Sequence, residues 1–144
     1  MRSLILSTAT RVLAPAILVV SVLVFLRGHN APGGGFIGGL LAATAFALIE
    51  KAEGVAAARR ALRLRPESIA AVGLGCALAS GLWGGIGEGH FLKGVWPAVV
   101  EATGLPLSSV ALFDLGVYLV VLGTVCAILF ILEETVAQEA DRGD

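Results

Sequence analysis

Charged residues are scarce in this sequence. Only 15% of the 144 residues are Asp, Glu, Lys or Arg, whereas 57% are hydrophobic, and the mean hydropathy is +0.91. A water-soluble domain of this length cannot bury so much apolar surface, so the composition predicts an integral membrane protein. The formal net charge of -1 gives no indication of nucleic-acid binding, and we expect no nucleic acid among its partners.

Cysteine is rare as well, which bears on metal and redox chemistry. Cys76 and Cys126 both lie in apolar runs, and they form neither a CxxC motif nor a Cys/His pattern with metal-ligand spacing. This placement is typical of small buried thiols. We therefore expect no metal site, and no other feature of the sequence predicts a cofactor.

The sequence also lacks the context that a nucleotide site needs. Gly33, Gly35 and Gly38 match the GxGxxG spacing. That pattern binds dinucleotides only where it follows a β-strand within a βαβ unit, and here an apolar helical segment precedes it. No GK[ST] follows, so a P-loop is excluded too.

Four apolar segments make up most of the chain: residues 4–27, 35–49, 69–86 and 108–132. The first is long enough to cross the roughly 30 Å hydrocarbon layer of a bilayer. It could instead be a signal peptide, but further apolar spans follow it rather than a soluble domain. The predicted fold class is all-α, an integral membrane protein with four transmembrane helices and a glycine-rich loop between the first two. We expect residues 1–134 to form this domain and residues 135–144 a polar tail.

The polar segment 50–68 predicts the orientation in the bilayer. It contains five cationic residues, which are Lys51, Arg59, Arg60, Arg63 and Arg65. By the positive-inside rule this segment is cytoplasmic. With four spans, both termini and the polar tail lie on the same side. Pro66 predicts the start of the third helix, and Ser108 or Ser109 predicts the N-cap of the fourth.

Small residues recur at every fourth position in two of the segments. The second segment contains Gly35, Gly39, Ala43 and Ala47, and the third contains Gly73, Ala77, Gly81 and Gly85. Such stripes let helix backbones approach closely within lipid. They predict helix packing.

The stretch that connects the first two segments and runs into the start of the second is rich in glycine. Its candidate functional residues are His29, Asn30, Pro32, Gly33, Gly34, Gly35, Phe36, Gly38 and Gly39. Proline prevents a helix from running straight through, and the glycines permit backbone angles that other residues resist. A simple turn needs fewer glycines, so the stretch is expected to make close contact with another element.

Two histidines and one aspartate could carry chemistry. His29 and His90 are expected on the same, non-cytoplasmic side, where they could relay protons or simply fix the loops by hydrogen bonding. Asp114 lies about five residues into the last span, or roughly 8 Å at 1.5 Å per residue. A carboxylate there is costly unless it is paired, and Arg27 and Lys93 join the histidines as expected partners. Two roles are therefore open for Asp114. It could act structurally, in an ion pair or as a helix cap, or it could carry protons.

Two stretches resemble the motifs of one family. Residues 28–40 have the sequence GHNAPGGGFIGGL, and residues 113–118 have the sequence FDLGVY. In this order and spacing they resemble the MrpB (MnhB) subunit of Mrp-type multisubunit cation/proton antiporters. The resemblance covers the chain to about Glu134.

The resemblance implies a place in a seven-subunit assembly that exchanges cytoplasmic Na+ (or Li+ or K+) for external H+ across the cell membrane. The implied partners, besides the lipid bilayer, are the large A and D subunits and the small C, E, F and G subunits. The large subunits resemble the proton-pumping subunits of respiratory complex I. The B subunit would then be a necessary transporter partner and not an enzyme, with the main proton path in larger subunits.

Two other functions remain open from the sequence. The chain could act alone as a homo-oligomeric cation/proton transporter with Asp114 as the coupling carboxylate. It could also be the equivalent subunit in the membrane arm of a complex I-like hydrogenase. The gene neighbourhood would distinguish these alternatives from an antiporter subunit.

Overall fold

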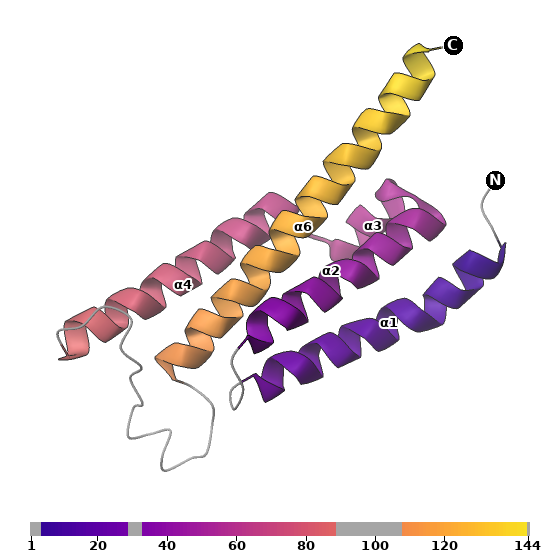
Figure 1. Cartoon of the computed structure of the whole chain (residues 1–144). Helices are drawn as coiled ribbons and strands as arrows, with labels where there is room; N and C mark the ends of the chain where they lie inside the picture. Colours follow the sequence, from indigo (N-terminus) through magenta and orange to yellow (C-terminus); the bar gives the residue numbers. More distant parts are fainter. Residues whose placement is uncertain (1–3, 29–32, 89–107, 144) are drawn as a thin grey trace.

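The computed structural model describes residues 4–28, 33–88 and 108–143, and this part of the chain is helical with no strand. The helices are α1 (Leu4–Arg27), α2 (Gly34–Glu53), α3 (Val55–Leu62), α4 (Pro66–Glu88) and α6 (Ser109–Arg142). The four long helices lie side by side, and the short α3 lies at the end of the bundle where α2 ends (Figure 1). The predicted all-α fold class is confirmed.

Three of the described helices are long and apolar enough to cross a membrane: α1, α2 and α6. The fourth long helix, α4, has 23 residues and packs along α6. A fourth crossing by α4 therefore stays a prediction. The expected membrane protein is supported by these helices, each of which contains an apolar stretch long enough to span the hydrocarbon layer.

The helix ends follow from local chemistry. The Ser108 side chain accepts a hydrogen bond from the Ala111 N–H at 3.1 Å, so the predicted N-cap of the last span is confirmed. Pro66 is the first residue of α4, a position where a missing N–H costs nothing. Between α2 and α3, Gly54 has φ 92°, a positive value that glycine adopts without strain.

The last helix, α6, organises the bundle. Both α2 and α4 pack along it, and α1 packs against the other side of α2. Figure 1 shows this order from α4 through α6 and α2 to α1. The buried core lies between these helices and consists of Ala42, Ala43, Phe46, Ala58, Ile69, Leu122, Cys126 and Phe130. Alanine predominates on the α2 side, so this helix can come close to its neighbours.

The contact of α4 with α6 is a close approach of two backbones. A Cβ on Gly73 would lie 2.7 Å from the Gly116 backbone oxygen, and a Cβ on Gly116 would lie 2.7 Å from the Gly73 backbone oxygen. Gly123 of α6 is a third example. A Cβ on this residue would lie 2.5 Å from the Pro66 backbone oxygen of α4. Real Cβ atoms do not occupy such positions, so these glycines determine how near the helices lie.

Two features differ from the expectations for the polar segments. Residues 55–62, expected as part of a loop, form the short helix α3. The last helix does not end at Leu132 but continues to Arg142. Ion pairs explain part of the difference: Lys51 Nζ lies 2.6 Å from Glu133 Oε2, and Arg59 Nε lies 3.0 Å from Glu134 Oε1. These contacts hold the extended end of α6 against α2 and α3.

Candidate functional site

The two motif stretches meet in space, at the start of α2. The Gly35 backbone N–H donates a hydrogen bond to Asp114 Oδ1 at 2.9 Å. Gly33 is the N-cap residue of α2, with φ 92°, and as a glycine it has no side chain to accept from the first N–H groups. An N-cap side chain normally accepts from the second or third helical N–H, and Gly35 is the second residue of α2. Asp114 of α6 therefore supplies from a neighbouring helix the cap that α2 lacks.

The contact places an acidic side chain at the N-terminus of a helix. The N-terminus of a helix carries partial positive charge from its unpaired N–H groups, and a negative side chain there is stabilised. The second oxygen, Oδ2, is buried and has no hydrogen-bond partner among the described residues. Of the expected cationic partners, Arg27 forms no ion pair with Asp114 in the described structure. His29, His90 and Lys93 lie outside the described residues.

The absence of a side chain at Gly35 is required by this contact. A Cβ there would overlap the Asp114 backbone oxygen and would lie 2.5 Å from Oδ1. At the preceding turn, Gly28 and Gly34 face each other, and a Cβ on Gly28 would lie 2.5 Å from the Gly34 Cα. The glycine-rich stretch thus lets α1, α2 and α6 approach one another at one point.

A second polar contact lies one turn further along α2. Ser21 Oγ of α1 donates to the Gly38 backbone oxygen at 2.7 Å and lies 2.8 Å from the Tyr118 hydroxyl of α6. Ser21 is buried, and the Tyr118 ring packs on Phe25 with 5.3 Å between ring centroids. Because Gly38 has no side chain, the Tyr118 ring can pass over it; a Cβ would lie 3.1 Å from the ring. Three helices are joined by this hydroxyl pair.

Sequence reasoning missed Ser21. It is the only polar side chain between Arg11 and Arg27, which was a signal that could have been used. A single serine in a membrane helix most often bonds to its own helix, so the signal alone does not identify a partner. Tyr118, the sole tyrosine of the chain, was noted within the second motif but without a contact.

The remaining predicted residues are distributed as follows. His29, Asn30 and Pro32 lie outside the described residues, and Phe36 is exposed on α2. In the first stripe of small residues, on α2, three residues are buried (Gly35, Gly39 and Ala43) and Ala47 is half-buried. In the second stripe, on α4, Gly73 and Gly81 are buried, whereas Ala77 and Gly85 are half-buried. A Cβ on Gly39 would lie 2.8 Å from the Tyr118 backbone oxygen, so this residue faces α6.

A buried carboxylate, that of Glu50, lies near the other end of α2. Glu50 is 4% exposed, its Oε1 lies 3.6 Å from Lys51 Nζ, and its Oε2 has no hydrogen-bond partner among the described residues. Fifteen residues separate it from Gly35, or about 22 Å along the helix at 1.5 Å per residue. The core residues between the two ends are apolar, among them Ala42, Phe46 and Leu122. No chain of side-chain hydrogen bonds joins the two carboxylates within the described structure.

Comparison with known proteins agrees with this arrangement of motifs. Residues 5–127 match a family model described as a domain related to the MnhB subunit of Na+/H+ antiporter. The chain belongs to the MnhB family. Both halves of the contact between Gly35 and Asp114 lie inside the matched region of this MnhB-family chain.

Similar proteins include two that are named as the B subunit of a Na(+)/H(+) antiporter. The one from Bacillus subtilis is 37% identical, and the alignment covers 94% of this chain and 94% of the relative. The one from Alkalihalophilus pseudofirmus is 36% identical over 90% of this chain and 92% of the relative. A third, from Rhizobium meliloti, is named as the A/B subunit of a probable K(+)/H(+) antiporter; it is 33% identical over 82% of this chain, which is 12% of that protein.

Proposed function

We propose that this MnhB-family chain is an accessory, helix-packing component of a multisubunit antiporter that exchanges a monovalent cation for H+ across the cell membrane. The near full-length similarity to proteins named as the B subunit of an antiporter supports this proposal. The role is that of a transporter component and not of an enzyme. The relatives' names include both Na+ and K+, so the proposal specifies a monovalent cation.

The geometry of Asp114 is the observation that carries the accessory role. One of its oxygens is used by the Gly35 N–H, which ties the carboxylate to a helix end. A proton carrier must bind and release its proton during each cycle, whereas a cap only needs an oxygen that stays hydrogen-bonded to the helix end. The apolar core between Asp114 and Glu50 supports the same interpretation, because the described part of this chain offers no polar route of its own across the bilayer.

Direct contact with a large subunit is part of the proposal. In the Rhizobium meliloti relative, the region similar to this chain is 12% of a much longer protein whose name combines the A and B subunits. Two parts of one polypeptide are held together, so the same parts on separate chains are expected to be neighbours. Further contacts with the D, C, E, F and G subunits are proposed from the family resemblance.

The orientation and the stripes of small residues complete the proposal. We propose that Lys51 and the arginines of α3 face the cytoplasm, because cationic loops favour that side of a membrane. The neighbouring ends of α1, α2 and α6 and both chain termini would then lie on the same side. The exposed apolar side chains of α1, such as Val19 at 60% and Leu23 at 59%, face lipid or other subunits. Gly39 and Gly81 serve helix–helix contact.

Reconstitution tests the accessory role. The chain purified alone is placed in proteoliposomes, and the co-expressed assembly is placed in a parallel set. Cation-driven proton flux is then measured in both. The proposal predicts flux only with the assembly, and it predicts that an affinity tag on this chain co-purifies the large subunits. Flux from the chain alone would support the stand-alone transporter instead, and co-purification of hydrogenase subunits would support the membrane arm of a hydrogenase.

A further inference from the structure

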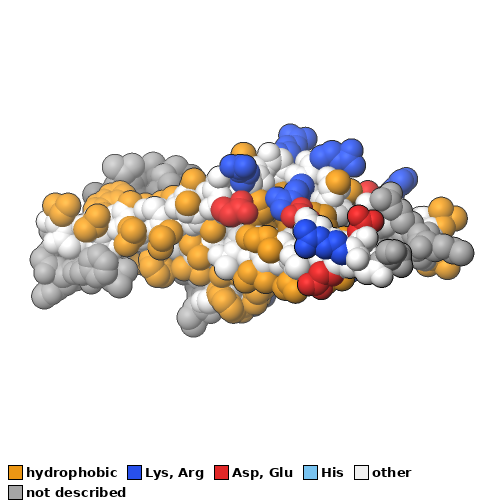
Figure 2. Space-filling view, turned by 90° about the horizontal axis from the view of Figure 1, so that it is seen from above, with side chains coloured by type: hydrophobic (Ala, Val, Ile, Leu, Met, Phe, Trp, Pro, Cys, Tyr) orange, Lys and Arg blue, Asp and Glu red, His pale blue; other side chains and the backbone are white. Residues whose placement is uncertain are grey.

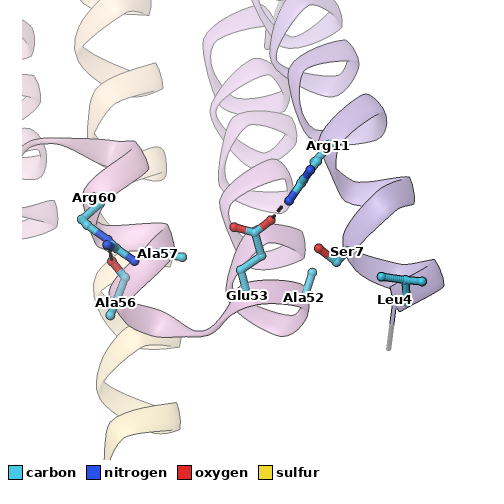
Figure 3. Close-up of a pocket in the computed structure, with 8 residues that line it drawn as sticks. All are labelled: Leu4, Ser7, Arg11, Ala52, Glu53, Ala56, Ala57 and Arg60. Carbon is cyan, nitrogen blue, oxygen red and sulfur yellow. Dashed lines mark hydrogen bonds and ion pairs between the residues drawn. The ribbon is translucent and has the colours of Figure 1, made fainter. Parts of the chain in front are cut away.

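A hollow with a polar rim lies at the arginine-rich end of the bundle (Figure 3). Its volume is about 350 Å³, and residues of α1, α2 and α3 line it. These include Leu4, Ser7, Arg11, Glu53, Ala57 and Arg60. Figure 3 shows Arg11 of α1 directed toward Glu53 of α2, and Arg60 of α3 directed toward the Ala56 backbone oxygen of its own helix. Its alanines and leucine give it apolar walls beneath the charged rim.

A residue with a buried hydroxyl group lines an adjoining hollow. A second hollow of about 200 Å³ shares Arg11, Glu53 and Ala57 with the first and is also lined by Thr10. Thr10 is 2% exposed, and its Oγ1 has no hydrogen-bond partner within the described part of the chain. Buried hydroxyl groups are normally hydrogen-bonded, so an unsatisfied one beside a cavity indicates a missing polar group.

The charges around the hollow are unequally engaged. Lys51 and Arg59 are held by carboxylates of α6, Glu133 and Glu134, at 2.6 and 3.0 Å. Arg11 Nε lies 4.0 Å from Glu53 Oε1, and the Arg11 side chain is 78% exposed, so this ion pair is weak and exchangeable. Among the described residues, Arg60 donates from its Nε to the Ala56 backbone oxygen at 3.2 Å. The Arg60 Nη groups have no ion pair among the described residues, and they remain able to bind an anion.

We infer that this hollow binds the phosphate headgroup of an anionic phospholipid. Arginine donates paired hydrogen bonds to phosphate oxygens, and Arg11 and Arg60 both line the hollow. Leu4 is 82% exposed beside the rim and offers an apolar surface to the acyl chains. A lipid fits better than a soluble anion because polar rim and apolar wall lie next to each other, as headgroup and chain do in a bilayer.

The neighbouring surface has the same character. Figure 2 shows Lys and Arg side chains gathered on one part of this end of the molecule, with hydrophobic side chains beside them. Directly after α3, Leu64 is 66% exposed between Arg63 and Arg65, neither of which has an ion pair among the described residues. An exposed leucine between two arginines suits the boundary between headgroups and acyl chains.

Native mass spectrometry of the full chain in detergent tests the inference. Phosphatidylglycerol and phosphatidylcholine with identical acyl chains are offered at equal concentration. We expect retention of phosphatidylglycerol about tenfold over phosphatidylcholine, and loss of that preference in Arg60→Gln. Arg60→Lys should retain part of it. Arg142→Gln, which removes one cation from the far end of α6, is the matched control and should behave as the unchanged chain.

Each alternative has its own result. Equal retention of the two lipids would overturn the inference, as would an equal loss in Arg142→Gln, which would indicate bulk charge alone. Displacement of the lipid by equimolar inorganic phosphate would identify a free-anion site. A photoreactive p-benzoylphenylalanine at Ala56, introduced in the assembled complex, should give adducts of lipid mass. Adducts with another protein chain would show that a protein partner fills the hollow.

Discussion

Asp114 of α6 caps α2 through the Gly35 N–H, at 2.9 Å, across 79 residues of sequence. The cap is supplied in trans to the helix because the N-cap residue itself, Gly33, has no side chain. The two motifs of this MnhB-family chain are therefore two halves of one contact. A substitution in either half is expected to weaken the same helix junction.

The first prediction concerns the missing side chain at Gly35. In Gly35→Ala the new Cβ would overlap the Asp114 backbone oxygen and crowd its carboxylate, so α2 must move away from α6. We expect a loss of about 1 to 3 kcal/mol in stability, seen as a lower unfolding temperature in detergent. Gly75→Ala is the matched control, because a Cβ at Gly75 meets nothing within 4 Å. An equal loss in both variants would mean that glycine is needed for some other reason.

The second prediction concerns the hydroxyl pair of Ser21 and Tyr118. Tyr118→Phe removes one hydrogen bond between helices. It should lower the free energy of unfolding by about 0.6 kcal/mol, the average for such bonds in a membrane protein. Ser21→Ala removes the bonds to both Tyr118 and the Gly38 backbone oxygen and should cost more. Thr44→Val is the control, since the Thr44 hydroxyl bonds only within its own helix, to Leu40. The double variant Ser21→Ala with Tyr118→Phe should lose no more stability than Ser21→Ala alone. If the stability losses of the two single variants instead added in full, the two hydroxyl groups would not be paired.

The third prediction concerns orientation. The arginines of α3 predict that Arg60 is cytoplasmic and Lys93 is outside. In a background without Cys76 and Cys126, a membrane-impermeant thiol reagent should label Lys93→Cys but not Arg60→Cys in intact cells. Everted vesicles should give the opposite pattern. Labelling of position 60 in intact cells would reverse the proposed topology.

The helices could be predicted from the sequence because their signals are local. The apolar runs, Pro66 and Ser108 each act within a few residues, and the structure has helix starts at both. The helix α3 was missed because it is only 8 residues long and is embedded in a charged segment, where apolar length gives no signal. The extension of α6 was missed because Glu133 and Glu134 read as a polar end, whereas their partners lie on other helices.

The contact at the candidate site was only partly predictable. Asp114 stood out because a carboxylate inside a span needs a partner. The sequence suggested cationic side chains, since these can be recognised by residue type. The partner found among the described residues is a backbone N–H, which every residue but proline has, so composition cannot single it out. Only the fold makes the Gly35 N–H available, at the uncapped start of α2.

The substitution Asp114→Asn tests the central claim most directly, with Asp114→Ala as its comparison. Asparagine and aspartate are about equally good helix caps, so the Asn variant keeps the acceptor for the Gly35 N–H, whereas the Ala variant loses it. The measurement is co-purification of the other subunits together with cation-driven proton flux in everted vesicles. The account predicts an Asn variant that assembles and retains most of the exchange, and an Ala variant that assembles poorly. A fully assembled but inactive Asn variant would contradict it and would make Asp114 a proton carrier.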